Sequence, residues 1–442
     1  MTIQERVKPT SGPGLPSSMN VVPAPRRMSI ALIYGRMPLP MTRADQMTVA
    51  HLISYLSARG HDVDLFTLDT GEPISPEQMS WLRSRCREIV TFRQSPISSI
   101  VACLVAMLRQ RPMQVGWFTN PSQIRAVHKA IAERHYDIAY TYYIRSAEVV
   151  RGLSCAGVAR KPRQPVTYLA MQLSQALNTK RIAERATRWT DRIIYSLERH
   201  IVRRYEAVIW KDFTRTVLIS PRDVEEIRDA GREYGLPEID NFLICAHGVD
   251  IARFSPRPEM EQPGTLVFSG VMATNTNINA VLWFVQNCWA TVKKSVPNAK
   301  LLIVGRSPAP EIRALATDPA ITVTGEVPDP ADYIARAEVC INPMQAGAGM
   351  QNKLIEYLAS GKAVVATPVA NEGVGAKDGE QLVEAATAEK FAKEVIALLE
   401  DPSRRTNLGR AGRAYIESHW TWEKFFGELE ADMLAQSATA DK

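Results

Sequence analysis

The sequence predicts an α/β protein built from two doubly wound, Rossmann-like domains. Short apolar segments typical of buried parallel strands alternate with segments of helical periodicity along both halves of the chain. The length of 442 residues exceeds what one hydrophobic core supports and fits two domains of about 200 residues each. A polar, proline-bearing stretch at residues 256–264 separates the halves and is typical of a linker.

The N-terminal half opens with a predicted strand at residues 28–35, a helix at 44–59 and a second strand at 62–67. No G-x-G-x-x-G motif follows the first strand, so nothing here indicates a bound dinucleotide. Asp62 and Asp64 form a D-x-D string, but they stand at the start of their strand, whereas open α/β sheets bind ligands at the carboxyl ends of strands. We therefore expect a polar strand face here and not a metal or diphosphate site.

The segment 341–376 organises the C-terminal half. A short strand ends at a proline, a glycine-rich turn follows, and residues 350–360 have the periodicity of a helix. Backbone N–H groups around residues 347–350 would point out of the helix N-terminus, which suits a phosphate. Lys353 and Glu356 lie one turn apart on the polar face of this helix, and by themselves they favour an ordinary solvated i,i+3 pair.

As a whole, this stretch resembles the donor-binding segment of the glycosyltransferases of family four, which have the GT-B fold. The resemblance covers most of residues 265–420. It implies that the glycine-rich turn receives the diphosphate of a nucleotide sugar, that Glu356 holds the ribose hydroxyls, and that transfer retains the configuration of the anomeric carbon. One position departs from the family pattern, since Ala348 stands where many members carry another glutamate.

A second part of the donor site is expected in the loop after the first strand of the C-terminal half. Many family members place an Arg and a Lys in this loop, whereas this chain has Thr274, Asn275 and Asn277. The phosphate charge must then be met by Lys353, Arg306 and the helix N-terminus. By resemblance, the expected donor-binding residues are Gly270, Asn275, Arg306, Val327 (whose backbone would face the base), Gly347, Ala348, Gly349 and Met350, with Lys353 and Glu356 as the catalytic residues.

The resemblance also assigns roles to the parts of the chain. Residues 247–250 read His-Gly-Val-Asp and resemble the sequence at the family's domain crossover. We expect a disordered tail at 1–27, an N-terminal acceptor-binding domain at 28–255, a linker at 256–264, a C-terminal nucleotide-sugar-binding domain at 265–418 facing the first across a cleft, and a helix at 419–436 that crosses back and packs on the N-terminal domain.

On the acceptor side, Arg43 and Arg145 are candidates. Arg145 follows a predicted strand at residues 136–143, and residues at such strand ends line the interdomain cleft in this fold.

Two segments of the N-terminal half bear on membrane contact. Residues 97–108 are rich in large apolar side chains and are followed by Arg109 and Arg111. A core helix explains this run, and the alternative is an apolar wall that contacts lipid or a lipid acceptor, with the arginines at the headgroups. Residues 180–204 hold eight basic residues against three acidic ones, which indicates either a solvated helix face or contact with anionic lipid or an acidic acceptor.

Composition excludes several classes of protein. The sequence contains no run of 18 apolar residues, so no membrane-spanning helix is expected. The start of the chain lacks the apolar core of a signal peptide. A net charge of +6 over 442 residues is too dilute to indicate nucleic-acid binding. The six cysteines include no C-x-x-C pair, so we expect reduced thiols of a cytoplasmic protein. No cluster has metal-ligand spacing, so we expect no metal and no cofactor beyond the nucleotide sugar as co-substrate.

The leading prediction is a glycosyltransferase that moves a sugar from a nucleotide diphospho-sugar to a saccharide or lipid-linked acceptor in the assembly of a surface polysaccharide. We expect it in the cytoplasm, with peripheral contact to the anionic inner leaflet as an open alternative. Two other functions stay open. A nucleotide-sugar epimerase would require carboxylates and a histidine grouped in the cleft. A non-catalytic scaffold of a polysaccharide machine would suit Ala348 and a loop without basic residues.

Overall fold

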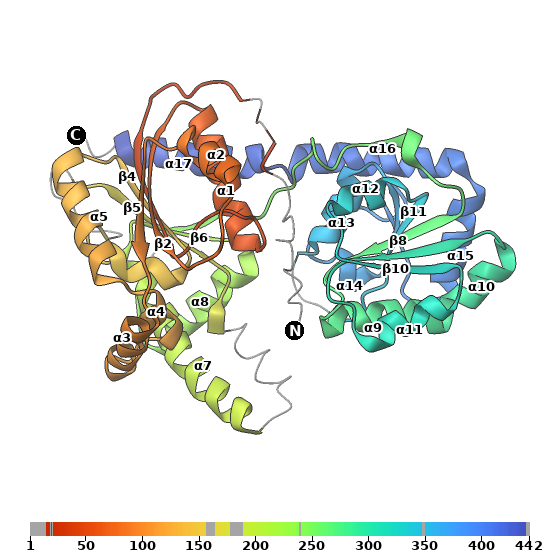
Figure 1. The fold of residues 1–442 in the computed structure, drawn as a ribbon, viewed down its shortest axis with the longest axis horizontal. Coiled ribbons are helices and arrows are strands. Elements are labelled where there is room, and N and C mark those ends of the chain that lie inside the picture. The colour runs from red at the N-terminus through yellow and green to blue at the C-terminus, as the bar shows by residue number, and fades with distance from the viewer. Residues whose placement is uncertain are drawn as a thin grey trace, which may run out of the picture. The chain divides into compact units, whose positions relative to one another are not determined.

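The chain forms two compact units, each with its own parallel sheet (Figure 1). The N-terminal unit comprises the described residues of Ser18–His247 and Phe425–Lys442, and the C-terminal unit comprises those of Met1–Ser17 and Gly248–Lys424. The computed structural model describes residues 15–17, 19, 21–155, 164–176, 189–237, 240–346 and 350–438, with the backbone alone for 189–197. Most of the predicted tail at 1–27 lies outside these ranges.

The N-terminal unit contains a parallel sheet with the strand order β3-β2-β1-β4-β5-β6-β7. Its strands are β1 (Ser29–Tyr34), β2 (Asp62–Asp69), β3 (Glu88–Arg93), β4 (Ile138–Tyr142), β5 (Val166–Gln172), β6 (Arg215–Leu218) and β7 (Phe242–Ile244). Its helices are α1 (Ala44–Ala58), α2 (Pro76–Arg83), α3 (Pro96–Leu108), α4 (Met113–Phe118), α5 (Pro121–Arg134), α7 (Trp189–Ile209) and α8 (Pro221–Glu233), with short 3-10 turns η1 (Ile144–Val149) and η2 (Trp210–Asp212). β1, β4 and β5 are buried along nearly their whole length, as expected for parallel strands covered on both faces.

The C-terminal unit contains a parallel sheet with the order β10-β9-β8-β11-β12-β13. Its strands are β8 (Thr265–Ser269), β9 (Lys300–Val304), β10 (Ile321–Gly325), β11 (Val339–Asn342), β12 (Ala363–Ala366) and β13 (Val383–Glu384). Its helices are α9 (Asn275–Phe284), continued by a π-helical turn η4 (Val285–Trp289) and α10 (Ala290–Ser295), then α11 (Pro310–Ala314), α12 (Pro330–Ala335), α13 (Asn352–Ala359), α14 (Pro368–Asn371), α15 (Ala388–Glu400) and α16 (Pro402–His419), with short turns η3 (Pro258–Met260) and η5 (Leu315–Thr317). α17 (Trp422–Ala438) begins in this unit and continues in the N-terminal one.

Local signals decide where several helices begin. The side chains of Asn120, Ser220 and Thr387 cap α5, α8 and α15. Each accepts a hydrogen bond from a backbone N–H group in the first turn of its helix. Pro121 and Pro221 stand at the first position of α5 and α8, where a backbone N–H has no partner inside the helix.

In both sheets the strand order reverses beside the first strand of the unit. β1 lies between β2 and β4, and β8 lies between β9 and β11. Because the connections leave in opposite directions from this point, a crevice forms there at the carboxyl ends of the strands. Both candidate sites described below lie at such a switch point.

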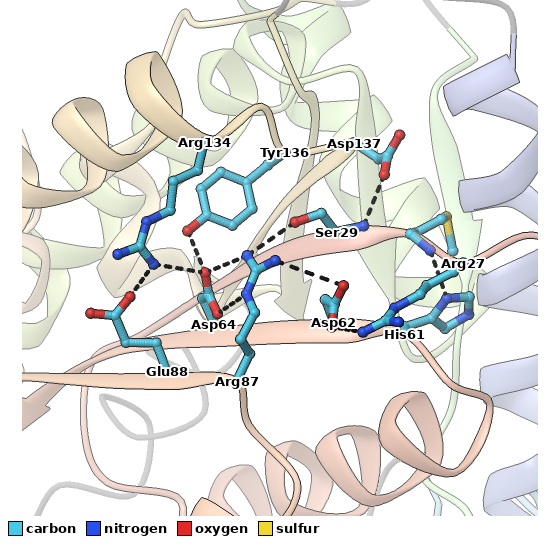
Figure 2. A network of polar contacts seen from close by, with 11 residues as sticks. Arg27, Ser29, His61, Asp62, Asp64, Arg87, Glu88, Arg134, Tyr136 and Asp137 are labelled. Carbon is cyan, nitrogen blue, oxygen red and sulfur yellow. Dashed lines mark hydrogen bonds and ion pairs between the residues drawn. The ribbon is translucent and has the colours of Figure 1, made fainter.

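The amino-terminal end of the N-terminal sheet is filled by polar contacts (Figure 2). The buried carboxylate of Asp64 accepts hydrogen bonds from Arg87 Nε at 2.9 Å, Arg87 Nη2 at 2.6 Å and the Tyr136 hydroxyl at 2.6 Å, and Arg134 lies 3.4 Å away. Burial raises the pKa of Asp64, but the bonds from Arg87 and Tyr136 outweigh it and leave the pKa below its usual value. Asp62 lies 3.7 Å from Arg87. Asp64 thus belongs to a buried ion-pair network, which corrects the expectation of a simple polar strand face.

The last helix, α17, contacts the N-terminal unit from Phe425 onward. The carboxylate of Glu430 accepts hydrogen bonds from the Tyr55 hydroxyl at 2.8 Å and from Arg59 Nε at 2.8 Å, and it lies 2.7 Å from His61 Nε2. These charged bonds attach the C-terminal helix to α1 and to the start of β2.

The segment 256–264 is not a free linker. The N–H of Gln262 donates to the carbonyl of Arg336 at 3.0 Å, and the N–H of Gly264 donates to the Glu338 carboxylate at 2.7 Å. The structure therefore places this segment in the C-terminal unit and moves the boundary between units to His247–Gly248. Its polar composition suggested a linker because composition does not reveal which backbone groups are bonded.

Helix α3 turns its large apolar side chains away from the protein. It lies beside α4 (Figure 1). The two helices pack through small residues, since Ser99 and Ala106 are buried and a Cβ on Gly116 would lie 2.7 Å from the Cβ of Ala106. Seven large apolar side chains of α3 are exposed by 42–86%: Ile97, Ile100, Val101, Leu104, Val105, Met107 and Leu108. The core-helix alternative is therefore wrong, because here the small residues form the packed face.

The basic run at 180–204 is described in part. Residues 180–188 lie outside the described ranges. Arg203 is ion-paired with Glu226 at 2.6 Å and with Glu233 at 2.9 Å, so the charge of this one arginine is neutralised within the protein. Among the helices that the structure describes, none has the length and apolarity to cross a bilayer.

All six cysteines are free thiols, as the sequence predicts. Burial raises the pKa of Cys86, Cys245, Cys288 and Cys340 to about 12, so these thiols are unreactive members of the two cores.

Candidate functional site

Two glycines shape the carboxyl end of the C-terminal sheet. Gly270 follows β8 with a φ of +153°, and Gly305 follows β9 with a φ of +146°. A Cβ on Gly305 would lie 1.7 Å from the carbonyl oxygen of Gly270, and a Cβ on Gly270 would lie 2.7 Å from Asn277 Nδ2. Only glycine permits this approach, which lets the loop after β8 turn directly over the strand ends and bring the start of α9 to the sheet.

Lys353 reaches this place from the first turn of α13. Its ammonium group donates a hydrogen bond to Asn277 Oδ1 at 2.5 Å, and it lies 4.4 Å from the centre of the Phe268 ring and 3.8 Å from Met344 Sδ. Asn277 donates its own Nδ2 to the carbonyl of Val271 at 3.0 Å, which orients its oxygen toward Lys353. Lys353 is buried, so the solvated pair that the two helix residues favour by themselves is wrong.

Burial lowers the pKa of Lys353 to about 7, although the negative charge of Glu356 opposes this shift. An amine with such a pKa changes its charge near neutral pH. A diphosphate beside it would favour the ammonium form. Lys353 therefore suits a place where negative charge arrives with a ligand.

Helix α13 is attached to β8 through Tyr357. The Tyr357 hydroxyl accepts a hydrogen bond from the N–H of Ser269 at 2.6 Å and lies 3.0 Å from Ser269 Oγ, and its side chain is fully buried. This attachment fixes the helix that carries Lys353 and Glu356, so both side chains project from a rigid element.

Glu356 lies one turn beyond Lys353 and is half-buried. Burial raises the pKa of its carboxyl group, while the charges of Arg253 and Lys353 lower it and that of Asp329 raises it. Arg253 is itself held by Asp329 at 2.8 Å. Within the described part of the chain, no hydrogen bond reaches the carboxylate of Glu356. The described residues thus leave its oxygens to other donors, such as hydroxyl groups.

Asn342 is the last residue of β11, beside β8 at the switch point. Its side chain is fully buried, and neither Nδ2 nor Oδ1 has a hydrogen-bond partner among the described residues. A buried polar group without a partner costs about 1–3 kcal/mol. Such a donor and acceptor at the carboxyl end of a central strand suit the polar groups of a ligand.

Among the described residues, the other predicted donor residues are less buried than Lys353. Met350 and Val327 are half-buried and pack against the hydrophobic core of the unit. Asn275 is the exposed first residue of α9, and the side chain of Arg306 is exposed after β9. Gly347, Ala348 and Gly349 lie outside the described residues.

On the acceptor side, the structure brings Arg43 and Arg145 together. Both line one pocket of about 210 Å³ in the N-terminal unit, at the carboxyl ends of β1, β4 and β5. Arg36 and Gln172 line it as well.

The sequence alone does not identify three residues of the donor side as site residues. Asn342 left a usable signal, a polar residue at the last position of an apolar strand before a proline. Asn277 stands in a loop where many family members have a basic residue. Its hydrogen bond to Lys353 joins positions 76 residues apart, so sequence patterns do not reveal it. Arg253 left no signal, because its proximity to Asp329 and Glu356 exists only after folding.

Within the described ranges, no three His, Cys, Asp or Glu side chains come together as metal ligands. That the donor reaction needs no metal stays a prediction.

Comparisons with known proteins agree with this geometry. Residues 263–401, from β8 to the end of α15, match the family described as glycosyl transferases group 1. An uncharacterized 44.6 kDa protein in the cps region of Klebsiella pneumoniae is 21% identical over 408 residues, which cover 90% of this chain and 98% of that protein. A GDP-mannose-dependent monoacylated alpha-(1-6)-phosphatidylinositol monomannoside mannosyltransferase of Corynebacterium glutamicum is 31% identical over 208 residues, which cover 42% of this chain and 54% of that protein.

Among solved structures, sucrose-phosphate synthase from Thermosynechococcus elongatus has the same fold, with a TM-score of 0.61 at 19% identity over 94% of this chain and all of that one. Two Rossmann-like units of this kind define the GT-B class. The chain is a glycosyltransferase with the GT-B fold, and its C-terminal unit carries the match to glycosyl transferases group 1. The fold class and the enzyme class predicted from the sequence are confirmed.

Proposed function

We propose that the protein transfers a sugar from a nucleotide diphospho-sugar to a saccharide or lipid-linked acceptor, with retention, in the assembly of a surface polysaccharide. The relative from a cps region supports the surface-glycan setting. The GDP-mannose-dependent relative supports a nucleoside diphosphate as the carrier of the sugar.

One observation carries the proposal. Glu356 is a half-buried carboxylate on a rigid helix at the carboxyl edge of the sheet, and no hydrogen bond from the described residues satisfies it. Two adjacent hydroxyl groups, such as those of a ribose, would supply the missing donors. Lys353 and the unpartnered amide of Asn342 would then meet the diphosphate and the polar groups of the sugar.

The chemistry needs few protein groups. The bond between the anomeric carbon and the phosphate oxygen breaks, and a bond from that carbon to the acceptor hydroxyl oxygen forms on the same face of the sugar. The hydroxyl proton moves to an oxygen of the departing diphosphate, so no separate base is required. The ammonium group of Lys353 stabilises the negative charge that develops on the leaving group.

A thermal-shift panel of nucleoside diphosphates and nucleotide sugars tests the proposal. A ligand at 100 times its dissociation constant stabilises the folded state by about 2.7 kcal/mol, which raises the melting temperature measurably. We expect one nucleotide family to shift the parental protein and to lose this effect in Glu356→Ala. If no nucleotide or nucleotide sugar shifts the parental protein, the donor assignment is wrong.

Two separate observations argue against the two alternative functions. An epimerase would group a histidine with the carboxylates, but the charged groups that act on Glu356 are Arg253, Lys353 and Asp329. The match of residues 263–401 to glycosyl transferases group 1 favours an enzyme over a scaffold.

We also propose that helix α3 contacts the anionic cytoplasmic leaflet of a membrane. The helix carries no charged residue, its seven large apolar side chains are exposed, and the exposed Arg109 follows directly at its C-terminal end. A 13-residue helix of this kind can lie in the interface between headgroups and acyl chains but cannot span a bilayer. Such contact would hold the enzyme near a lipid-linked acceptor.

Vesicle flotation tests this contact with Leu104→Ser and Leu108→Ser in one chain. A matched control is Val22→Ser, which removes an exposed apolar side chain from another part of the same unit. We expect the parental protein and the control to float with anionic vesicles and the double variant to stay in solution. Equal flotation of all three proteins, or none by the parental protein, would refute the assignment of α3.

A further inference from the structure

The pocket at the switch point of the N-terminal sheet has the features of a ligand site, and most of its charged lining residues are positive. It lies at the carboxyl ends of β1, β4 and β5 and at the start of α1. Its volume of about 210 Å³ is below the roughly 300–1,000 Å³ of pockets for drug-sized molecules and suits about one sugar unit. Its lining residues include three arginines, Arg36, Arg43 and Arg145, and one acidic residue, Asp45.

Two of the three arginines have a carboxylate partner. Arg36 is buried and lies 3.5 Å from Asp45, whose carboxylate also accepts a hydrogen bond from the Tyr34 hydroxyl at 2.9 Å. The side chain of Arg43 is 58% exposed, with the carboxylate of Glu72 3.9 Å away.

Arg145 is oriented by aromatic rings. Its guanidinium lies 4.5 Å from the centre of the Tyr143 ring and 5.2 Å from that of Phe118, over which Arg36 also lies at 5.6 Å. It donates a long hydrogen bond of 3.4 Å to Gln114 Oε1. Among the described residues no carboxylate pairs with Arg145, so the pocket holds more positive than negative charge. A stacked, pre-oriented guanidinium is suited to a planar or tetrahedral anion.

A second observation, independent of the charge, also points to a ligand. Gln172 ends β5 and lines the pocket; its side chain is 5% exposed, and its Oε1 has no partner among the described residues. Gln172 and Tyr143, the residue after β4, both have a φ of +72°, a conformation that side-chain-bearing residues rarely adopt. Such strain concentrates at ligand sites, where it holds side chains in the orientation that binding needs. The acceptor oxygen of Gln172 requires a donor, which a hydroxyl group supplies.

We propose that this pocket binds the acidic group of an anionic acceptor, with the arginines on the anion and Gln172 on a neighbouring sugar hydroxyl. This inference rests on the proposed function, because it names the chemical class of the acceptor. The same chemistry has two sources, a phosphate ester on the acceptor sugar or the carboxylate of a uronic acid. His247 adds no positive charge to the pocket at neutral pH, since burial lowers its pKa to about 4.

Calorimetric titration of the full-length protein tests the proposal with glucose 6-phosphate, glucuronate and glucose as probes. We expect at least one of the two anionic sugars to bind at least tenfold more tightly than glucose. The anion that binds more tightly identifies the source. If none of the probes binds, or if glucose binds as tightly as both anions, the proposal is wrong.

The variants are Arg145→Met and, as matched control, Arg222→Met, which removes an exposed arginine of α8 outside the pocket. Loss of a charged hydrogen-bonded partner should weaken anion binding by about 10- to 100-fold in Arg145→Met and leave it unchanged in the control. Gln172→Leu should weaken the binding of the same probe by a smaller factor. Unchanged anion binding in Arg145→Met would overturn the proposal. Arg43→Gln replaces Arg145→Met if the melting temperature shows that the latter is unfolded.

Nucleotide binding to the same proteins separates this inference from the proposed function. We expect Arg145→Met to keep the nucleotide-induced thermal shift, because the donor residues belong to the C-terminal unit. A parental protein that binds the anionic sugar but no nucleotide would contradict the proposed donor site and leave the anion pocket standing.

Discussion

Two polar clusters of this protein lie at opposite ends of similar parallel sheets, and they differ in how fully their hydrogen bonds are made. At the amino-terminal end of the N-terminal sheet, the buried Asp64 is bonded by Arg87 and Tyr136, and its pKa lies below the usual value. At the carboxyl end of the C-terminal sheet, Glu356 receives no hydrogen bond from the described residues, and its pKa is raised. The described residues complete the first cluster without a ligand, but they leave the second incomplete.

The difference teaches how to separate structural from functional polar groups. A complete network lowers the energy of the folded protein by itself, since every buried donor and acceptor is paired. An incomplete one costs stability, and this cost is recovered when a ligand supplies the missing partners. The pKa of Lys353 near 7 and the unpartnered amide of Asn342 place both of them in the incomplete cluster.

The largest expected effect is that of Glu356→Ala on catalysis. Two charged hydrogen bonds to the donor contribute roughly 1.5–3 kcal/mol each, so kcat/KM should fall by about 10² to 10⁴. The melting temperature should stay close to the parental value, because the substitution removes no hydrogen bond between the carboxylate and the described residues. A folded variant with near-parental turnover and donor affinity would end the assignment of Glu356 to the donor site.

Asp64→Ala should instead reduce stability and leave donor binding unchanged. Removal of the buried acceptor leaves Arg87 and Tyr136 without their partner and should lower the free energy of unfolding by about 3 kcal/mol, as measured by urea denaturation. Nucleotide affinity should not change. Because the folded pKa of Asp64 is below its value of 3.8 in an unfolded chain, its contribution is present above about pH 4 and is lost on acidification. Asp240→Ala, at an exposed ion pair, is the control and should cost less than about 1 kcal/mol.

A pH titration of donor binding probes Lys353. Its pKa of about 7 means that the free protein loses the ammonium charge above neutrality, and the diphosphate binds the charged form. The affinity for a nucleotide sugar should therefore fall by up to about tenfold per pH unit between pH 7 and 9. In Lys353→Met the affinity should be lower at pH 7 and flat with pH. A parental affinity that does not change over this range would show that Lys353 does not meet the diphosphate.

Asn342→Leu tests whether the unpartnered amide belongs to the incomplete cluster. Replacement of two unsatisfied buried groups by an apolar side chain of similar size should leave the free energy of unfolding unchanged or raise it by about 1 kcal/mol, while donor affinity falls. Chemical denaturation and donor titration on the same sample measure both. A destabilised variant with unchanged donor affinity would assign Asn342 to the structure instead.

The smallest expected effect is that of a chelator. If Lys353 and the N-terminus of α13 meet the leaving diphosphate, EDTA should leave the rate of sugar transfer unchanged. Inactivation by EDTA that Mg²⁺ or Mn²⁺ reverses would show that a metal carries the charge assigned to these groups.

The sequence by itself determined the fold class, the enzyme class and the helix on which Lys353 and Glu356 stand. The elements follow from local and periodic properties: strands and helices from the spacing of apolar residues, and a phosphate site from a glycine-rich turn before a helix. The enzyme class followed from the resemblance of this stretch to the donor-binding segment of family four. The sequence also selected Arg145, because residues after parallel strands meet at one edge of the sheet, and it named Arg43 as a second candidate.

Tertiary structure decided the surroundings of each residue. Only folding brings Asn277 to Lys353 and Arg253 to the neighbourhood of Glu356, and this converts an apparent surface pair into a buried lysine and a half-buried carboxylate. Folding likewise leaves the apolar face of α3 uncovered and attaches residues 256–264 to the C-terminal unit. The physical reason is the same in each case. Periodicity states which face of an element is apolar or polar, but burial, pKa and hydrogen bonding depend on which distant element covers that face.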